Sequence, residues 1–329
     1  MYNIAVISGD GIGKEVMECC EYLLDKLDLE FSFEYGEAGF DCFNKNGTTL
    51  PEETLKIANK SDAVLFGAST STPGEPSPII NLRKELNVYA NIRPIKSYKG
   101  VKCLRDDIDF VIVRENTEGL YSQVEYGDEN KMIAERIITR KASERISKVA
   151  FNLCEKRGES KVTCVHKSNV LKKTDSVFKE SFYNISKQYP QIATEDYYVD
   201  AMAMYLITQP QNFDVIVASN LFGDILSDES AGLVGGLGLA PSGNIGDHNG
   251  LFEPVHGSAP DIAGKNIANP CSMILSASMM LDYLGEWETA NDIKTAVEKV
   301  IAECRIRTPD LGGDASTMDV TKAIVKELI

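Results

Sequence analysis

The amino-acid sequence predicts an α/β protein, in which short apolar strands lead into helices through glycine-rich or polar turns. Residues 3–8 have an apolar strand pattern, 9–13 are glycine-rich, and a helical pattern runs from about 14 to 27. Residues 213–218 again have a strand pattern and lead directly into Asn220 and Gly223. Such alternation is typical of α/β folds. The length of 329 residues indicates two domains or one large α/β unit.

The other elements follow from the same patterns. We expect strands where apolar residues run together or alternate, helices where they recur at helical spacing, and loops where Pro and Gly gather. The expected strands are 63–68, 90–94, 110–113, 161–165 and 195–200, and the expected helices begin near 52 and 79 and span 142–157, 201–206, 273–284, 286–304 and 317–328. Residues 71–78, 253–264 and 308–313 are expected to be loops.

Overall composition narrows the class of protein. A net charge of −15 argues against a nucleic-acid partner, which requires a basic surface. The sequence contains no apolar run long enough to span a bilayer, and the strand pattern begins at once without the basic start of a signal peptide. The eight cysteines show no CxxC spacing, so we interpret them as reduced packing residues. We therefore expect a cytoplasmic protein without a membrane partner.

Asp224 and Asp228 are the first candidate functional residues. They are four apart, so both carboxylates would lie on one face of a helix. Because they follow a strand directly, Asp224 would lie in the first helical turn beyond that strand, where α/β proteins place their sites. Mg²⁺ is commonly held by one or two carboxylates together with waters and substrate oxygens. The alternative is a solvated acidic helix face.

The glycine-rich turn at 9–13 has two interpretations. A strand, a glycine-rich turn and a helix also form the GxGxxG fingerprint of dinucleotide-binding folds. Here the glycines are spaced G-x-G-x-G, and no well-placed acidic residue follows about twenty residues on. The glycines indicate either a close approach of backbone to another group or a sharp turn.

Basic residues near other turns are candidates for substrate binding. Arg83, Arg93 and Arg114 lie at expected strand or helix edges. Arginine suits bidentate contact with carboxylates, so one interpretation is that the three hold a polyanionic substrate; ordinary surface ion pairing is the alternative for each. Lys167 follows the strand 161–165 and is either a surface lysine or a group that moves protons.

Ten segments together resemble the β-decarboxylating dehydrogenases, the family of isopropylmalate, homoisocitrate and isocitrate dehydrogenases. The segments are the turn at 9–13, LRK at 82–84, ANIRP at 90–94, VRENTEGLY at 113–121, HKSNVLK at 166–172, VDAMAM at 199–204, NLFGDILSD at 220–228, GGLGLAPS at 235–242, FEPVHGSAPDIAGKNIANP at 252–270 and TPDLGG at 308–313. The resemblance covers essentially the whole chain, and within the family it is nearest to 3-isopropylmalate dehydrogenases of archaeal type.

The resemblance implies a two-domain α/β fold that is not a Rossmann fold. A large domain would combine residues 1–95 with 236–329 and bind the cofactor. A small domain, 96–235, would carry the metal site and the dimer interface. The active site would lie in the cleft between the domains, and each site of a homodimer would be completed by the partner subunit. A tetramer is the alternative assembly.

The resemblance also assigns roles to the candidate residues. Mg²⁺ or Mn²⁺ would be held by Asp224 and Asp228 of one subunit and Asp200 of the other. Arg83, Arg93 and Arg114 would bind the carboxylates of a 2-hydroxy-3-carboxy acid. Lys167 of the partner subunit would take the hydroxyl proton and Tyr121 would help to protonate C3. Asn169 would lie near the nicotinamide.

The expected cofactor is NAD. The resemblance places the cofactor at His256, Gly257, Ser258, Ala259, Asp261 and Ile262, with Asn269 at the adenine and Glu253 and Asp310 as further contacts. A carboxylate at Asp261 can accept both ribose hydroxyls of NAD, whereas it would repel the 2′-phosphate of NADP. Relatives that use NADP carry lysine and tyrosine at the positions of Asp261 and Ile262.

The expected substrate is 3-isopropylmalate, converted to 4-methyl-2-oxopentanoate and CO₂ in leucine biosynthesis, with 3-methylmalate as a smaller alternative. Ile79, four residues before Arg83, would present an apolar wall to the isopropyl group. Ser77 instead resembles the serine of isocitrate-type enzymes, so homoisocitrate or isocitrate dehydrogenase is the second possibility. A regulatory subunit with this fold and no turnover is the third.

Overall fold

The computed structural model describes residues 1–158 and 161–328, which divide into two compact units. Unit 1 comprises Met1–Val88, Ser97–Asp106 and Val234–Ile329, and unit 2 comprises Tyr89–Lys96 and Asp107–Leu233. The expected domain boundaries lay at 95/96 and 235/236. The first expected boundary falls within β4, which lies in unit 2, and the second falls two residues after the start of the last segment of unit 1.

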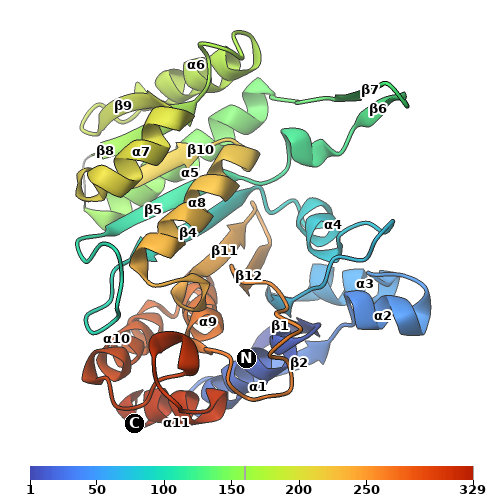
Figure 1. The fold of residues 1–329 in the computed structure, drawn as a ribbon, viewed down its shortest axis with the longest axis vertical. Helices are drawn as coiled ribbons and strands as arrows, with labels where there is room; N and C mark the ends of the chain where they lie inside the picture. Colours follow the sequence, from blue (N-terminus) through green and yellow to red (C-terminus); the bar gives the residue numbers. More distant parts are fainter. Residues whose placement is uncertain (159–160, 329) are drawn as a thin grey trace. The chain divides into compact units, whose positions relative to one another are not determined.

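Unit 1 contains five strands of a mixed sheet in the order β2-β1-β3-β12-β11 (Figure 1). Strands β1, β2, β3 and β12 are parallel where they pair, and β11 is antiparallel to β12. The elements are β1 Tyr2–Gly9, α1 Ile12–Leu24, β2 Phe31–Tyr35, α2 Phe40–Asn46, α3 Glu52–Lys60, β3 Ala63–Ala68, α4 Pro78–Glu85, η3 Leu237–Leu239, β11 Pro241–Ile245, β12 Gly250–Pro254, α9 Cys271–Leu284, α10 Trp287–Glu303, η4 Pro309–Leu311 and α11 Thr317–Leu328.

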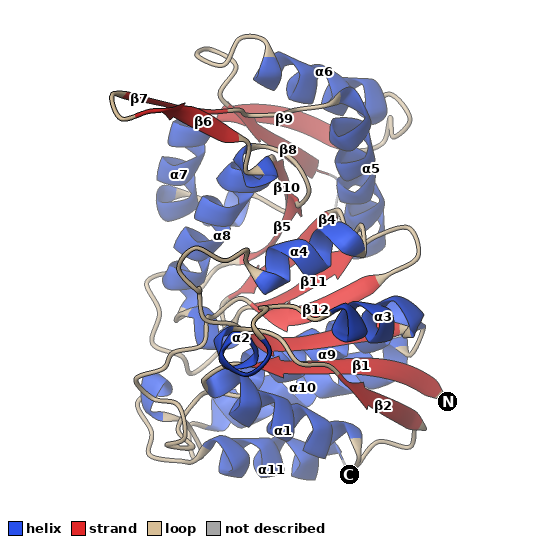
Figure 2. Ribbon diagram, turned by 90° about the vertical axis from the view of Figure 1, so that its right-hand side faces the viewer, coloured by secondary structure: helices blue, strands red, loops and turns tan. Residues whose placement is uncertain are grey.

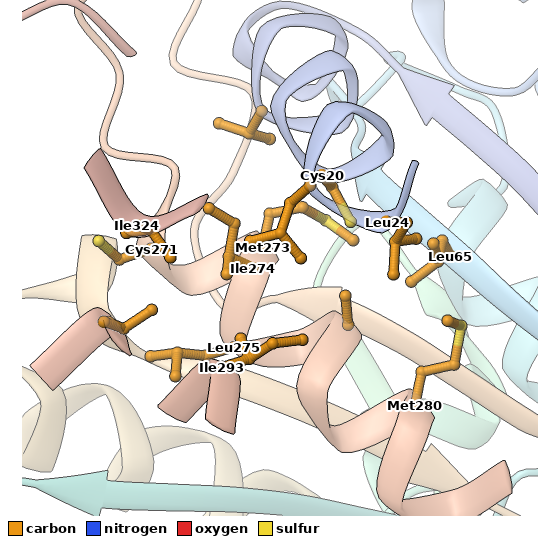
Figure 3. Packing of buried hydrophobic residues seen from close by; sticks show 14 of the residues in the cluster. Cys20, Leu24, Leu65, Cys271, Met273, Ile274, Leu275, Met280, Ile293 and Ile324 are labelled. Carbon is orange, nitrogen blue, oxygen red and sulfur yellow. The ribbon is translucent and has the colours of Figure 1, made fainter. Parts of the chain in front are cut away.

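Both faces of the unit 1 sheet are covered. Because successive side chains of a strand point to opposite faces, Ile4 and Val6 of β1 pack with residues of α1, α9, α10 and α11, whereas Ala5 and Ile7 pack with residues of α3 and α4. Figure 2 shows these helices beside the strands of unit 1. Figure 3 shows the first of these cores, in which Cys20 of α1 and Cys271 of α9 lie among aliphatic side chains. All eight cysteines are free thiols and six of them are buried, as expected for packing residues.

Unit 2 contains a second group of five strands in the order β4-β5-β10-β8-β9. Strands β5, β10, β8 and β9 run parallel, and β4 is antiparallel to β5. The elements are β4 Ala90–Lys96, β5 Asp109–Glu115, η1 Leu120–Ser122, β6 Glu125–Asp128, β7 Lys131–Ala134, α5 Arg140–Arg157, β8 Lys161–His166, α6 Thr174–Ser186, β9 Ala193–Tyr198, α7 Val199–Thr208, η2 Pro210–Asn212, β10 Val215–Ala218 and α8 Asn220–Val234.

One antiparallel hairpin, β6–β7, stands apart from the unit 2 sheet and projects from it (Figures 1 and 2). Its residues are almost all exposed, including Tyr126 and Met132. An isolated two-stranded hairpin is marginally stable in water, so a surface of this kind is suited to packing against another chain. Among the residues that the structure describes, no helix combines the length and the apolar character needed to cross a bilayer.

Candidate functional site

Two buried arginines from adjacent strands converge on a carboxylate of α8. Arg93 lies on β4 and Arg114 on β5, and both are at least 95% buried. Nη1 of Arg114 forms an ion pair with Oδ1 of Asp224, and Nη2 of Arg93 lies 3.3 Å from the same oxygen. Nη1 of Arg93 also contacts Oδ1 of Asp228 at 3.2 Å. The structure therefore brings together four of the predicted site residues.

The helix begins earlier than the sequence indicated. We expected Asp224 in the first turn, but α8 begins at Asn220 and Asp224 lies in the second turn, so this expectation was wrong. Gly223 explains how α8 packs so closely against β5, since a Cβ at this position would lie 2.8 Å from the Cβ of Arg114. Asp224 and Asp228 are one turn apart and share a face, as predicted.

Uncharged side chains hold the two guanidinium groups in place. Oδ1 of Asn220 accepts hydrogen bonds from Nε and Nη2 of Arg114 at 3.0 and 2.8 Å. Oδ1 of Asn91 accepts from Nε of Arg93 at 2.6 Å, and Oγ of Ser227 accepts from its Nη1 at 2.6 Å. Sequence reasoning did not select these three residues, although all of them lie within the ANIRP and NLFGDILSD segments. Buried charges require such partners.

Tyr121 joins this cluster from the 3₁₀ turn η1. Its hydroxyl donates a hydrogen bond of 2.5 Å to Oδ2 of Asp224, and its ring lies under the guanidinium of Arg114, 5.1 Å from the guanidinium carbon to the ring centre. Burial, and then the bond to Asp224, raises the pKa of Tyr121, so the phenol keeps its proton at neutral pH. Tyr121 is thus a proton-bearing group beside the carboxylates.

Asp228 has a raised pKa, chiefly because it is partly buried and secondarily because Asp224 is near; the two arginines act in the opposite direction. This is a site in which acidic oxygens are crowded together beside fixed cations. Within the described residues, no group of three or more His, Cys, Asp or Glu side chains is placed to hold a metal ion. The third predicted metal residue, Asp200, is elsewhere in the unit.

Asp200 and Lys167 form a second feature of unit 2. Lys167 follows β8 directly and Asp200 lies in the first turn of α7. Nζ of Lys167 donates a 2.5 Å hydrogen bond to Oδ1 of Asp200, and this bond lowers the pKa of the exposed Asp200 carboxyl. Lys167 also lies over the ring of Tyr198, 5.7 Å from its centre. Asn169, in the same turn as Lys167, is exposed.

In unit 1, Arg83 pairs with Glu253. Nε and Nη2 of Arg83 lie 3.1 and 2.6 Å from Oε1 of Glu253, and both side chains are buried. Nδ2 of Asn244 donates to the same oxygen at 2.7 Å. Ile79 and Arg83 are one turn apart on α4 and share a face, and Ser77 precedes the helix. Glu253, expected at the cofactor, is thus joined to the expected substrate arginine.

A pocket of about 290 Å³ lies in unit 1. Its lining residues come from α1, the turn η3, the loop after β12 and the turn η4, and they are Ile12, Gly238, His256, Ile262, Ile267, Ala268, Asn269, Pro309 and Asp310. Four of them, His256, Ile262, Asn269 and Asp310, were predicted to contact a cofactor. The sequence did not single out Ile12, Gly238, Ile267, Ala268 and Pro309, because apolar side chains in a sequence do not distinguish a ligand pocket from a core.

Polar side chains of this pocket form hydrogen bonds with neighbouring groups of the protein. Nδ2 of Asn269 donates to Oδ2 of Asp310 at 3.0 Å. Nδ1 of His256 donates to the carbonyl oxygen of Gly257 at 2.9 Å, whereas its buried Nε2 has no hydrogen-bond partner among the described residues. Burial lowers the pKa of His256, so the ring is neutral near pH 7 and Nε2 is a bare acceptor. A buried acceptor without a partner is suited to a ligand.

The glycine-rich turn at 9–13 packs against the loop that contributes to this pocket. The backbone N–H of Ile12 donates to the carbonyl oxygen of Ser258 at 2.9 Å. A Cβ at Gly11 would lie 2.0 Å from that oxygen, and its φ of +55° favours glycine. Oγ of Ser258 is 2.7 Å from Oγ1 of Thr70. The glycine thus permits a close approach to protein backbone. Asp261 and Gly257 are exposed and Ala259 is half-buried.

The structure thus contains two α/β units, an arginine-lined carboxylate pair in unit 2 and a partly apolar pocket in unit 1. The family model described as isocitrate/isopropylmalate dehydrogenase matches residues 3–325. The chain belongs to this family, and it is a β-decarboxylating dehydrogenase. The predicted family and fold class are confirmed.

Individual relatives cover the full length. The chain is 57% identical over 333 residues to the 3-isopropylmalate/3-methylmalate dehydrogenase of Methanocaldococcus jannaschii, covering 100% of this chain and 99% of the relative. It is 51% identical over 341 residues to the homoisocitrate dehydrogenase of the same organism, covering 99% and 97%. The crystal structure of isocitrate dehydrogenase from Methylococcus capsulatus superimposes with a TM-score of 0.96 at 42% identity, covering 100% and 99%.

Proposed function

We propose that the protein catalyses the NAD- and divalent-metal-dependent oxidative decarboxylation of 3-isopropylmalate to 4-methyl-2-oxopentanoate and CO₂, a step of leucine biosynthesis, and that it also accepts 3-methylmalate. The observation that carries the substrate is the apolar side chain of Ile79, one turn before Arg83 on α4. The identity of 57% to a relative named for both substrates supports it.

The side chains fit a hard divalent cation. Asp224 and Asp228 offer carboxylate oxygens from one helix face, which is a donor set that Mg²⁺ and Mn²⁺ prefer. We infer that Asp200 of the partner subunit supplies the third carboxylate. When bound, the cation would lower the pKa of the substrate hydroxyl and stabilise the negative charge that follows on the substrate. The rest of the chemistry falls to the protein.

Each predicted residue then has a defined task. Arg93 and Arg114, and Arg83 of unit 1, bind the substrate carboxylates and orient C2 and C3. Lys167 of the partner subunit takes the proton from the hydroxyl at C2. Tyr121, which its raised pKa keeps protonated, delivers a proton to C3 after CO₂ has left.

The pocket of unit 1 fits the adenosine half of NAD. The aliphatic side chains of Ile12, Ile262 and Ile267 suit a flat ring, and Nε2 of His256 and the Asn269–Asp310 pair offer polar contacts. Asp261, exposed beside Ile262, accepts the ribose hydroxyls and repels a 2′-phosphate. Asn169 would lie near the nicotinamide. Glu253, through its bond to Arg83, would lie where cofactor and substrate meet.

Shared sites require a homodimer. Met204 and Ile207 of α7 and Ile225 of α8 each expose about half of their surface. Tyr126 and Met132 of the hairpin β6–β7 expose half of theirs or more. Exposed apolar side chains are candidates for the contact surface of such a dimer. We propose that α7, α8 and the hairpin β6–β7 pack against a second copy of the chain.

The substrate assignment is tested by three parallel assays. With NAD and Mg²⁺, we expect kcat/KM for 3-isopropylmalate to exceed that for homoisocitrate or isocitrate by at least about tenfold. The latter two acids would bury an additional carboxylate against an apolar wall, which cannot compensate the free-energy cost of removing that carboxylate from water. NADH absorbance is the readout, and EDTA is the control. If the enzyme instead prefers homoisocitrate, which Ser77 and the relative at 51% identity favour, then homoisocitrate is the substrate and the assignment of 3-isopropylmalate is wrong. Absence of NADH with all three acids would indicate a subunit without turnover.

The cofactor assignment is tested by the double variant Asp261→Lys and Ile262→Tyr. We expect the preference for NAD over NADP, measured as the ratio of the two kcat/KM values, to fall by at least about tenfold, because a cation replaces the repelling carboxylate. The variant Lys265→Ala, also on this loop and exposed, should leave the ratio unchanged. A wild-type enzyme that uses NADP as well as NAD would contradict the argument.

A further inference from the structure

The backbone around Lys167 is held at successive residues. The N–H of Lys167 donates to Oδ2 of Asp175 at 2.6 Å, and the N–H of Ser168 donates to Nδ1 of His166 at 3.2 Å. The carbonyl oxygen of Lys167 accepts from the N–H of Leu171 at 2.8 Å. The backbone of this turn is thus held by hydrogen bonds at both Lys167 and Ser168.

Asp175 is an acidic side chain with no assigned task. It lies in the first turn of α6 and is 99% buried. Its Oδ1 forms an ion pair with Nη1 of Arg136, which also lies 3.1 Å from Oγ1 of Thr174. One oxygen of the carboxylate thus pairs with a guanidinium, and the other accepts a hydrogen bond from the backbone of Lys167. A buried ion pair of this kind contributes little net stability, because desolvation offsets most of the attraction.

Arg136 extends the connection to α8. Its Nη2 donates to Oγ of Ser219 at 3.1 Å, and its guanidinium lies over the ring of Phe222, 5.2 Å from the ring centre. Ser219 and Phe222 flank the start of the helix that carries Asp224. Through Asp175, this guanidinium therefore connects the turn of Lys167 with the start of the helix that carries the carboxylate pair.

His166 supports the same turn from the other side. Because Nδ1 accepts from the N–H of Ser168, the hydrogen of a neutral ring is on Nε2, which donates to Oδ2 of Asp196 at 2.8 Å. Asp196 also accepts from Nζ of Lys179 at 2.7 Å and from the hydroxyl of Tyr183 at 2.5 Å. The ring is buried and its orientation is set by these partners.

We propose that Asp175 and Arg136 are positioning residues that hold the backbone of Lys167, so that its amino group is delivered to one place. The inference rests on the proposed function, in which Lys167 takes the substrate proton in the site of the partner subunit. Lysine has a long and flexible stem, so a fixed backbone is needed to restrict where Nζ can lie. Asp175 and Arg136 touch neither substrate nor cofactor and act through Lys167.

Two variants test the proposal by steady-state kinetics. We expect Asp175→Asn to lower kcat by about 10- to 100-fold, because small displacements of a reacting group have effects of this size. The KM values for hydroxy acid and NAD should change by no more than about twofold, since the arginine clamp and the pocket are untouched. Arg136→Lys keeps the charge next to Asp175 but not the fork, and should show a smaller fall in kcat.

Arg140→Met is the matched control. Arg140 begins α5 and pairs with Glu180 of α6 at 3.2 Å, but both side chains are at least half exposed. Losing this ion pair should leave kcat unchanged, because exposed pairs contribute little. If kcat falls equally in Arg140→Met and Asp175→Asn, the proposal is overturned.

Heterodimers separate positioning from general damage. Two tags allow purification of a dimer with Asp175→Asn in one subunit and Asp224→Asn in the other. One of its sites combines an intact Asp224 with the Lys167 of a subunit that retains Asp175, so about half of the wild-type activity should return. A heterodimer of Asp175→Asn with Lys167→Ala has no such site and should recover nothing above the Asp175→Asn homodimer.

The outcomes distinguish two failures. If Asp224→Asn complements Lys167→Ala but does not complement Asp175→Asn, Asp175 acts within its own subunit's site or on its fold, and the inference is wrong. If Asp224→Asn does not complement Lys167→Ala either, the sites are not shared and the proposed function fails with it. Should Asp175→Asn not fold, the same two crosses with Arg136→Lys decide the question.

Discussion

Replacing Asp224 with asparagine is expected to lower kcat/KM by roughly three orders of magnitude, an effect on the scale of removing one preorganised electrostatic contact from an active site. The size follows from the number of groups that meet at this carboxylate. Arg114 and Arg93 approach Oδ1, and Tyr121 donates to Oδ2. Asparagine removes the charge that balances two buried guanidinium groups, and with it one of the three carboxylates proposed to hold the cation.

Two measurements check this expectation. Mn²⁺ titration should show weaker binding to the Asp224→Asn protein, and kcat/KM should rise only partly as Mg²⁺ is increased. Asp282→Asn removes the same charge from an exposed position of α9 and should leave both quantities unchanged. An Asp224→Asn protein that keeps more than about a tenth of the wild-type kcat/KM would contradict the assignment.

Replacing Lys167 with alanine is expected to lower kcat by about 10²- to 10⁴-fold, the range of a general base. The KM of the hydroxy acid should change little, because the arginines bind its carboxylates. Added methylamine should restore part of kcat, since a small amine can enter the space left by the side chain and accept the proton. Rates are read from NADH absorbance.

Lys172→Ala is the control for this variant, because Lys172 is an exposed lysine of the same loop. Its kcat should equal that of the wild type. A Lys167→Ala protein with unchanged kcat, or one whose rate is insensitive to amines at every concentration, would show that Lys167 does not move the proton.

Much of the fold followed from the sequence where a strand is a continuous buried run or a helix has a regular buried stripe. The strand 63–68 and the helix 317–328 were expected within the bounds of β3 Ala63–Ala68 and α11 Thr317–Leu328. The hairpin β6–β7 and strand β2 were not expected. Their residues are exposed or half-buried, so they lack the apolar runs from which the other strands were recognised.

Helix α6 was missed for another reason. Thr174–Ser186 carries mixed polar and apolar residues, of which only Asp175, Phe178, Ser181 and Phe182 are buried. Its buried face is therefore partly polar, and a pattern read from apolar residues alone does not show it. The same polar face contains Asp175, which explains why a residue so close to Lys167 was not selected from sequence.

The carboxylate–arginine cluster could be predicted in part. Strand ends in an α/β sheet gather polar residues, and this principle selected Arg114 and Asp224. Arg114, however, lies within β5 rather than beyond it, since the pairing with β4 continues to Glu115. The Arg83–Glu253 pair was beyond sequence reasoning, because 170 residues separate its members.

We propose that each active site takes Asp224 and Asp228 from one chain and Lys167 and Asp200 from another. A purified heterodimer of Lys167→Ala with Asp224→Asn tests it most directly, through its rate of NADH formation with 3-isopropylmalate. Two nearly inactive proteins should combine into a dimer with about half of the wild-type rate, because one site contains every intact residue. A heterodimer as inactive as its parents would show that the two chains do not share active sites in this way.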